Sequence, residues 1–431
     1  MNFKILDLFC GAGGFSCGLD SLDEFTTVLG VDNNQPAIDT FSYNLKSKVI
    51  CGDLTDSNVK NEIVELSRSL GVNMIIGGPP CQGFSLKGKN LGLDDPRNFL
   101  FKEYVHLVKR IKPEVFVIEN VKNLLNACDG YFLDQIIQEM ESMGYLLNHG
   151  VLNAKDFGVP ESRERAIIIG SLSRSVPLPE RTVDTYTTVR DAISDLAYLE
   201  SGEGNSLSFY INESQSEYQR KLRNPSGELY NHIATSHSQV AIDKLKMIPP
   251  EGDKSSLPKE LHGKQKFSTT WSRLIWNSQS PTIDTRFDTP SNGRNSHPEL
   301  HRAITPREAA RIQSFPDSFR FLGKKGDVCK QIGNAVPPLM ARVIGESIVS
   351  AYKDERVETE ECSIYLGDST KIVKELKKNG IKVNHIITDP PYNIAQENNF
   401  TTMKNKRTGI DFGTWDNAFD VCGWKKILWM Y

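Results

Sequence analysis

The sequence contains no apolar run that approaches the roughly 20 consecutive residues needed to span a lipid bilayer. Its first residues, MNFKILDLFCGAGG, lack the basic segment of a secretory signal and reach glycine after about ten positions. We therefore expect no contact with a membrane and a cytoplasmic location.

Cysteine pairs and excess charge are also scarce. The eight cysteines include no CxxC pair, which argues against a zinc site or a redox motif. The formal net charge of −3 argues against a protein that coats nucleic acid by bulk charge alone, but it allows a local basic surface. A composition of 39% hydrophobic and 24% charged residues is typical of a globular protein. A chain of 431 residues has room for about two or three domains.

The first 170 residues alternate between short apolar runs and longer amphipathic stretches. The expected strands are FKILDLF, TTVLGV, KVICG, VNMIIGG, EVFVIEN and RAIIIG. The expected helices are Ala37–Asn44, Ser57–Leu70, Asn98–Ile111 and Phe132–Met143. This alternation predicts βαβ units and a doubly wound α/β domain with a largely parallel sheet.

Regular periodicity fades after Ser171, which predicts a smaller, irregular domain. A helix is expected within ITPREAARIQSF, with Thr305 as N-cap, Pro306 in the first turn and Glu308 completing a capping box. A second helix is expected in LMARVIGESIVSAY. The charged stretch 353–361 is expected to be a linker, followed from residue 362 by a strand–helix–strand pattern that looks incomplete.

A glycine-rich turn, DLFCGAGGFS, follows the first expected strand and opens a helix. Asp32 ends the second strand 21 positions after Gly11, where a nucleotide-binding fold places a ribose acceptor. Asp53 ends the third strand and could accept a hydrogen bond from an adenine amino group. A nicotinamide dehydrogenase and an S-adenosylmethionine (SAM) methyltransferase would both show this pattern, and so would a strand–helix turn without a ligand. The short GAGG segment suits SAM, which carries no phosphate.

The loop GGPPCQGFS places Cys81 at the end of the fourth strand, where ligands bind in a doubly wound sheet. Tandem prolines stiffen this loop, so Cys81 is a candidate nucleophile, although a lone cysteine is often a small core residue. Glu119 and Asn120 end the fifth strand at the same edge. Arg163 and Arg165 are two apart on an extended segment, so both could face the same crevice.

From residue 1 to about residue 352 the chain resembles a DNA cytosine-C5 methyltransferase. It carries six blocks of that family in order: DLFCGAGGFS, GGPPCQGFS, ENV, the RxR element, TPREAARIQSFPD and QIGNAVPP. One departure is visible, because Glu161 stands where the family usually has Gln.

The resemblance implies a SAM-dependent transfer of a methyl group to C5 of a cytosine that is swung out of the duplex. Cys81 would be the thiolate that adds to C6. Glu119 would be the hydrogen-bond partner or proton donor of N3 of the cytosine, and Arg165 would stabilise its O2. Arg163 would hold backbone phosphate or order the loop. A purely structural salt bridge between Glu119 and Arg165 is the alternative.

The resemblance also implies the cofactor contacts and requires no metal. The implied SAM contacts are Phe9, Gly11, Asp32, Asp53, Leu54, Pro80, Leu100, Asn334 and Val336. Since Asn334 and Val336 lie far along the chain, the C-terminal helix must pack against the first βα unit. The implied domains are a catalytic domain of residues 1–172 plus 326–352 and a target-recognition domain of residues 173–325.

Local charge supports DNA contact in the target-recognition domain. Between Lys254 and Arg311 there are ten basic and five acidic residues, a net charge of +5. Trp271, Arg273 and Trp276 are candidates for the base-reading edge. His297 and His301 are expected to be loop residues and not a metal pair.

The tail carries Asp389-Pro390-Pro391-Tyr392 after an expected strand. This resembles the catalytic loop of amino-group DNA methyltransferases, which modify N6 of adenine or N4 of cytosine; a simple Pro-Pro turn is the alternative. Gly367 and Asp368 fit a subgroup in which the SAM glycine loop comes later. Residues 362–431 are therefore expected to be a partial amino-methyltransferase domain without independent activity.

The expected protein is a monomeric bacterial enzyme that acts on double-stranded DNA, with a cognate restriction endonuclease in the same system. Three alternatives stay open: a tRNA cytosine methyltransferase, a catalytically idle DNA-binding remnant and a nicotinamide oxidoreductase. The fusion to an amino-methylating unit suggests an asymmetric recognition site, because each strand would then need its own chemistry.

Overall fold

A computed structural model describes residues 2–80, 100–126, 130–262 and 269–353, together with short segments between 355 and 406. The chain divides into two units, Met1–Tyr352 and Lys353–Tyr431. The predicted border between residues 172 and 173 stays a prediction.

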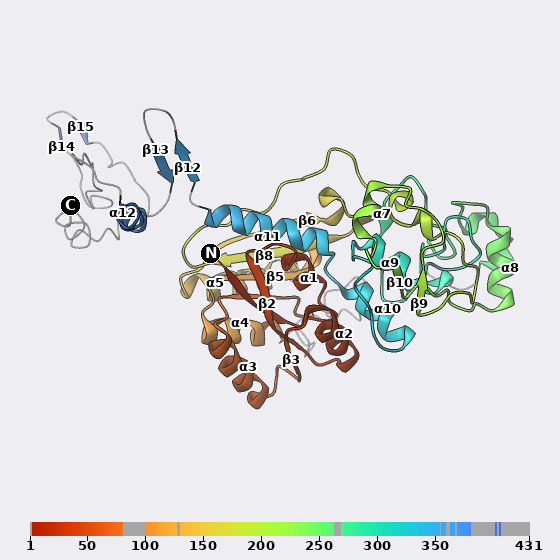
Figure 1. Ribbon diagram of the computed structural model, residues 1–431, viewed down its shortest axis with the longest axis horizontal. Coiled ribbons are helices and arrows are strands. Elements are labelled where there is room, and N and C mark those ends of the chain that lie inside the picture. Colours follow the sequence, from red (N-terminus) through yellow and green to blue (C-terminus); the bar gives the residue numbers. More distant parts are fainter. Residues whose placement is uncertain are drawn as a thin grey trace. The chain divides into compact units, whose positions relative to one another are not determined.

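A seven-stranded sheet organises the first unit, with strand order β3-β2-β1-β4-β5-β8-β6 (Figure 1). Its strands are β1 (Phe3–Leu8), β2 (Phe25–Asp32), β3 (Lys48–Cys51), β4 (Met74–Gly77), β5 (Val115–Val121), β6 (Leu146–Asn153) and β8 (Glu164–Ser171). The first five are parallel, and β8 runs antiparallel to both β5 and β6. The predicted doubly wound α/β fold is confirmed, and so are the six predicted strands.

Strand β6 was not predicted. Its sequence, LLNHGVLN, mixes apolar and polar residues, and only Leu152 is buried. The reason is its place at the sheet edge, where it pairs with β8 alone. An edge strand has a neighbouring strand on one side only, and the side chains of β6 other than Leu152 are exposed or half-buried, so β6 does not show the continuous apolar run of a central parallel strand.

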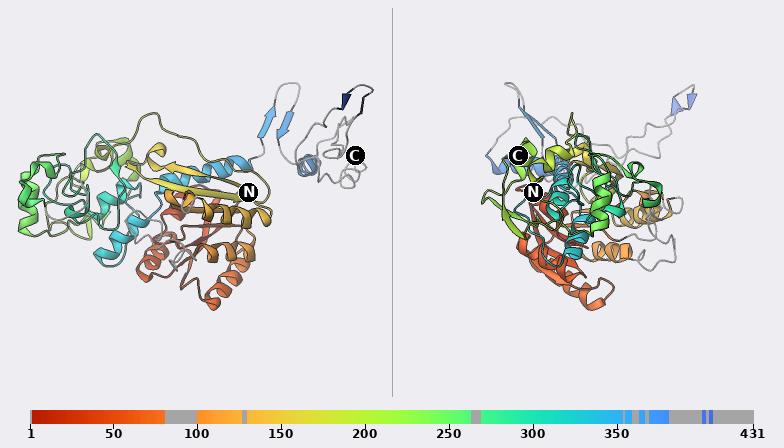
Figure 2. Two further views of the ribbon diagram at one scale, coloured as in Figure 1. Left: turned by 180° about the vertical axis from the view of Figure 1, so that it is seen from behind. Right: turned by 90° about the vertical axis from the view of Figure 1, so that its right-hand side faces the viewer.

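Helices cover both faces of the sheet (Figures 1 and 2). Alternate residues of a strand point to opposite faces, so each strand contributes to two cores. Leu6 and Leu8 share one core with α3 (Ser57–Leu70), α4 (Leu100–Ile111) and α5 (Tyr131–Ser142). Ile5 lies in the opposite core with α1 (Gly14–Leu19) and α11 (Pro338–Tyr352). Helix α2 (Gln35–Leu45) contributes Ile38 and Phe41 to a smaller cluster.

The C-terminal helix of the first unit packs against the first βα unit, as predicted. Helices α1 and α11 approach so closely that only glycine fits at two positions of α1. A Cβ atom at Gly18 would lie 2.2 Å from the carbonyl oxygen of Pro338, and one at Gly14 would lie 2.5 Å from that of Val336. This contact brings the segment before α11 to the end of β1.

The segment between β8 and α11 is irregular, as predicted. It holds short elements: α6 (Val189–Ile193), β9 (Leu207–Phe209), α7 (Glu217–Leu222), β10 (Glu228–Tyr230), α8 (Gln239–Met247), β11 (Ser280–Pro281), α9 (Pro306–Ile312) and α10 (Lys325–Asn334). The predicted capping box of α9 is confirmed. The Thr305 backbone N–H donates to Glu308 Oε2 at 2.8 Å, and the Glu308 N–H donates to Thr305 Oγ1 at 3.1 Å.

The base-reading edge predicted for this segment is wrong. Trp271, Arg273 and Trp276 are 7%, 1% and 4% exposed. The Arg273 guanidinium donates to the backbone carbonyls of Leu245, Ile248, His297 and Leu300. Trp276 stacks edge-on against His297, which is itself buried. These side chains hold the loops together and are not available to a DNA base.

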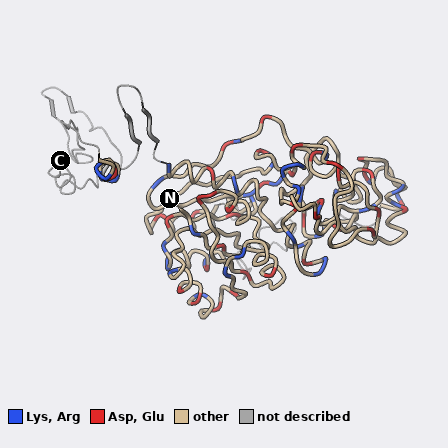
Figure 3. The backbone as a smooth tube through the Cα atoms, in the orientation of Figure 1, with Lys and Arg blue, Asp and Glu red and all other residues tan. Residues whose placement is uncertain are grey.

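Part of the charge behind the predicted net charge of +5 is not at the surface, and Lys264 and Lys266 lie outside the described residues. Four of the ten basic residues, Arg273, Arg302, Arg307 and Arg311, are buried. Along the described backbone Lys and Arg are interspersed with Asp and Glu (Figure 3). Within the described residues no three His, Cys, Asp or Glu side chains gather into a group that could hold a metal ion.

The second unit contains β12 (Glu355–Glu358), β13 (Ser363–Leu366), α12 (Ser369–Lys378), β14 (Thr401–Thr402) and β15 (Asn405–Lys406). Strand β12 pairs with β13, so part of the stretch expected to be a linker is a strand. The predicted strand at CSIYLGD and the helix after it are confirmed. Gly367, Asp368 and Asp389–Tyr392 lie outside the described residues. No helix of the described chain is long and apolar enough to span a membrane.

Candidate active site

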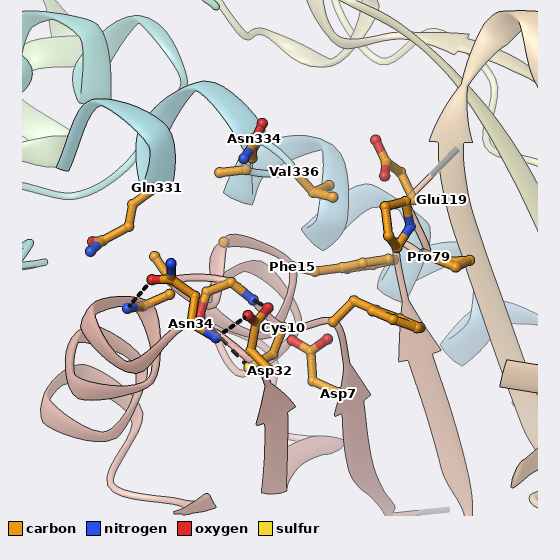
Figure 4. A pocket seen from close by; sticks show the side chains of 18 of the residues that line it. Asp7, Cys10, Phe15, Asp32, Asn34, Pro79, Glu119, Gln331, Asn334 and Val336 are labelled. Atoms are coloured by element: carbon orange, nitrogen blue, oxygen red, sulfur yellow. Dashed lines mark hydrogen bonds between the residues drawn. The ribbon is translucent and has the colours of Figure 1, made fainter. Parts of the chain in front are cut away.

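A cavity of about 730 Å³ opens at the carboxyl ends of the parallel strands. All the predicted site residues that the structure describes line it: Phe9, Gly11, Asp32, Asp53, Leu54, Pro80, Leu100, Glu119, Arg163, Arg165, Asn334 and Val336. Figure 4 shows Asn334 and Val336 across this cavity from Asp7 and Asp32. Cys81 lies outside the described residues.

The glycine turn after β1 orients Asp32. Phe9, Gly11 and Gly13 have positive φ angles of 56°, 52° and 92°, so the chain turns sharply here. The Gly11 N–H donates to Asp32 Oδ2 at 2.9 Å, and the Asn34 N–H donates to Oδ1 at 2.9 Å. Burial raises the pKa of Asp32, while these hydrogen bonds oppose the rise. The carboxylate is thus held in place with lone pairs left for a ligand.

The end of β3 supplies a second acceptor. Asp53 is exposed and accepts hydrogen bonds from the Thr55 N–H and hydroxyl, both at 2.9 Å. These bonds lower the pKa of the Asp53 carboxyl, so it is ionised at neutral pH. The next residue, Leu54, is buried and gives the same end of the cavity an apolar wall.

Asn120 ties the loop after β4 to β5. Its Nδ2 donates to the carbonyl oxygen of Pro79 at 2.7 Å, and its Oδ1 accepts from the Val121 N–H at 2.9 Å. The side chain is 7% exposed, so its hydrogen bonds are shielded from water. Asn120 therefore fixes the backbone at Pro79, two residues before Cys81.

Glu119 and Arg165 form an ion pair at the cavity wall. Arg165 Nε lies 2.9 Å from Glu119 Oε1, and the two side chains are 14% and 10% exposed. Antiparallel pairing of β5 with β8 places Val121 opposite Arg165 and so brings the two side chains together. The salt bridge considered from the sequence is present, and both of its members still line the cavity.

Arg163 is turned into the protein. It is 1% exposed and donates to the carbonyls of Ile283, Gly333 and Ala335 at 3.2, 2.9 and 2.9 Å. Burial lowers the pKa of Arg163 to about 10, still well above neutral pH. A contact with DNA phosphate does not fit this buried geometry. The other expectation, that Arg163 orders a loop, does, because Gly333 and Ala335 flank Asn334.

Glu161 belongs to the same buried network. Its side chain is fully buried, and Oε1 accepts from the Ile283 N–H at 2.5 Å and lies 3.6 Å from Arg163 Nη1. Burial raises the pKa of the Glu161 carboxyl, and the Arg163 charge opposes this rise. The glutamate thus joins Arg163 to the strand pair of β7 (Glu161–Ser162) with β11.

The sequence analysis missed Asp7, which lines the same cavity. It is 2% exposed, and Ser16 donates a hydrogen bond to its Oδ2 at 2.6 Å. Burial raises the pKa of Asp7 to about 8. The signal was available, because Asp7 lies next to the end of a central parallel strand, just before the glycine turn, and Asp32 and Asp53 lie at or just after the ends of β2 and β3.

The chain matches the family model described as C-5 cytosine-specific DNA methylase over residues 3–350. It is 37% identical over 360 residues to the type II methyltransferase M1.HphI of Haemophilus parahaemolyticus, covering 82% of this chain and 89% of that protein. It is 33% identical over 428 residues to the type II methyltransferase M.DdeI of Desulfomicrobium norvegicum, covering 92% and 98%.

A solved structure shows the same fold. It is a DNA modification methyltransferase encoded within an E. coli prophage, with a TM-score of 0.66 and 25% identity. The match covers 81% of this chain and 99% of that one. The Entamoeba histolytica methyltransferase EhMeth, at 16% identity and a TM-score of 0.55, shares the fold.

Proposed function

The chain belongs to the C-5 cytosine-specific DNA methylase family and is a SAM-dependent DNA (cytosine-5)-methyltransferase; we propose that it methylates a flipped-out cytosine through a covalent adduct with Cys81. One observation carries this proposal. The strand order brings the ends of β3, β2, β1, β4 and β5 to one cavity, which is lined from Asp53 at one end to Glu119 at the other.

The residues present fit SAM. Asp32 keeps acceptor capacity for ribose hydroxyls, and the ionised Asp53 can accept from an adenine amino group. Leu54 and Phe9 offer apolar surface to the adenine. When bound there, SAM supplies an activated methyl group. Asn334 and Val336 close the other wall, in positions that depend on the carbonyl contacts of Arg163.

The chemistry explains why a thiol and a charged pair are needed together. Cytosine C5 is a poor nucleophile, so the Cys81 thiolate adds to C6 and makes the ring electron-rich at C5. Glu119, after taking up a proton from solvent, donates that proton or a hydrogen bond at N3, while Arg165 stabilises the charge on O2. After C5 has accepted the methyl group, loss of its proton expels the Cys81 sulfur. The 2.9 Å ion pair holds Glu119 and Arg165 in one orientation for both roles.

Bisulfite sequencing of duplex DNA treated with the protein and SAM tests the reaction. We expect one cytosine in a defined sequence to be protected. DNA that carries 5-fluorocytosine should trap a covalent complex, because the fluorine cannot leave as a proton does. Cys81→Ser should abolish both signals while duplex binding stays measurable. Methylation by Cys81→Ser at the wild-type rate would contradict the proposal.

We infer that the protein is a monomer, that residues 173–325 select the DNA sequence, and that the enzyme is the modification half of a restriction–modification system. Methylation of duplex DNA but not of tRNA supports the choice of substrate. Resistance of the methylated site to an endonuclease encoded beside this gene supports the biological role, and a single mass by light scattering supports the monomer.

We also infer that residues 362–431 derive from an amino-group DNA methyltransferase and that the recognised site is asymmetric. The Asp389-Pro390-Pro391-Tyr392 segment supports the first inference. Sequencing of both strands of treated DNA tests the second. A C5 mark on one strand of a non-palindromic site agrees with it, whereas C5 marks on both strands of a palindrome contradict it.

A further inference from the structure

The order of the strands predicts which part of SAM lies over β1. Along the carboxyl edge, β3, β2, β1 and β5 contribute Asp53, Asp32, Asp7 and Glu119 in that order. In the proposed function, adenine lies at Asp53, ribose at Asp32 and the target base at Glu119. Adenine, ribose and sulfur are joined in that sequence in SAM. The sulfur therefore lies beyond the ribose, toward the base, where β1 ends at Leu8.

Asp7 is the carboxyl group at this place. Figure 4 shows Asp7 beside Asp32, with Glu119 farther along the cavity. Its side chain accepts a hydrogen bond from Ser16 Oγ at 2.6 Å. An ionised carboxyl that is 2% exposed needs a positive partner or several donors.

Among the residues that the structure describes, the groups that face Asp7 supply no positive charge. They are Asp32 at the end of β2, Asp20 at the end of α1, the Cys10 thiol in the glycine turn and the Tyr104 phenol on α4. Burial is the main cause that raises the pKa of Asp7 to about 8, and the two aspartates add to it. Below that pH the side chain therefore holds a proton in the protein without SAM.

We propose that Asp7 is the counter-ion of the SAM sulfonium and releases its proton to solvent when SAM binds. The O–H bond of the Asp7 carboxyl breaks, the electron pair stays on the oxygen, and no other bond changes. After methyl transfer the sulfur is a neutral thioether, so Asp7 takes a proton back from solvent. This inference rests on the proposed function.

Calorimetry in buffers of different ionisation enthalpy measures the released proton directly. At pH 7 we expect SAM to release close to one proton and S-adenosylhomocysteine to release far fewer. The Kd for SAM should fall about tenfold per pH unit below pH 8 and level off above it. Equal release with both compounds would overturn the assignment to the sulfonium, because both carry the same ammonium group. No release with SAM would overturn the whole inference.

Asp7→Asn should abolish the proton release. It should weaken SAM binding at pH 8.5 by at least about tenfold and change S-adenosylhomocysteine binding much less. Binding of S-adenosylhomocysteine also reports that the variant is folded. Should the variant fail to fold, the comparison of the two compounds on the wild-type protein decides alone.

Asp20→Asn is the matched control. Asp20 is an acid on the same βα unit, and burial raises its pKa to about 6, but it does not line the cavity. We expect this variant to release the proton as the wild type does. Loss of the release in Asp20→Asn, or its survival in Asp7→Asn, would overturn the assignment to Asp7. Failure of the wild-type protein to bind SAM at any pH would instead refute the proposed function.

Discussion

Arginine has different surroundings at the sheet edge and in the segment from Arg302 to Asp317. At the edge, Arg165 pairs with Glu119 and keeps 14% of its side chain exposed to the cavity. In the other segment, Arg302 and Arg311 are fully buried. Arg302 makes two hydrogen bonds with Glu308, at 2.7 and 2.8 Å. Arg311 bonds to Asp195 at 2.5 Å and to Asp317 at 2.6 Å.

The comparison shows why counting cations failed in the second region. A guanidinium has five N–H donors in a fixed plane, so it can join loops that have little regular backbone hydrogen bonding. Arg307 does this with the carbonyls of Tyr230, Pro316 and Phe319. The irregular segment thus uses arginine as internal support, whereas at the sheet edge Arg165 stays at the wall of the cavity.

The largest effect is expected from Arg311→Met. The substitution removes the Arg311 charge that pairs with two buried carboxylates, Asp195 and Asp317. We therefore expect the free energy of unfolding to fall by about 3–5 kcal/mol. Urea denaturation measures it. Arg220→Met on α7 is the control, since Arg220 is exposed and should change stability by less than about 0.5 kcal/mol. Equal stability of the two variants would remove the distinction between the two kinds of arginine.

Arg165→Lys should show the opposite behaviour. The charge remains but the planar fork is lost, so we expect kcat to fall about 10²–10³-fold while the unfolding midpoint stays near the wild-type value. Steady-state methylation and thermal denaturation measure the two quantities. Arg68→Lys on α3, an exposed position that does not line the cavity, should leave both unchanged. A variant that is unstable but has normal kcat would assign Arg165 to structural support.

A smaller effect is expected where the two ends of the first unit meet. Gly18→Ala places a Cβ atom 2.2 Å from the Pro338 oxygen, so α11 must shift at a cost of about 1–3 kcal/mol. SAM affinity should fall as well, because Val336 precedes this helix. Gly326→Ala on α10 is the control, since a Cβ atom there meets nothing within 4 Å. A thermal shift that is the same for both variants would contradict this account of the α1–α11 contact.

The catalytic half of the fold could be predicted because its strands are central and parallel. Such strands are buried on both faces, so each appears as an apolar run, and a polar residue at its end stands out. Asp32, Asp53 and Glu119 were found in this way. Asp7 follows the same rule. It was overlooked because the segment that contains it was interpreted only as a glycine turn. The edge strand β6 gave no such signal.

The surroundings of the remaining side chains could not be predicted. Arg163 and Arg165 look equivalent in the sequence, being two apart on one extended segment. In the structure, Arg163 donates to backbone carbonyls that are more than 100 residues away along the chain, whereas Arg165 pairs with Glu119 at the cavity wall. Likewise, β12 lies in a charged stretch that resembles a linker until its pairing with β13 is known.

Local patterns alone determined the α/β fold, the family and the edge of the sheet at which the cavity lies. The tertiary structure decided which arginine side chains are buried. It also decided that Glu119 meets Arg165 across two antiparallel strands, and that Asn334 and Val336 line the same cavity as Asp7. The physical reason is the distance along the chain between the residues that interact. Helix and strand periodicity depend on neighbours within a few residues, whereas the burial and charge of a polar side chain depend on partners that the chain brings from far away.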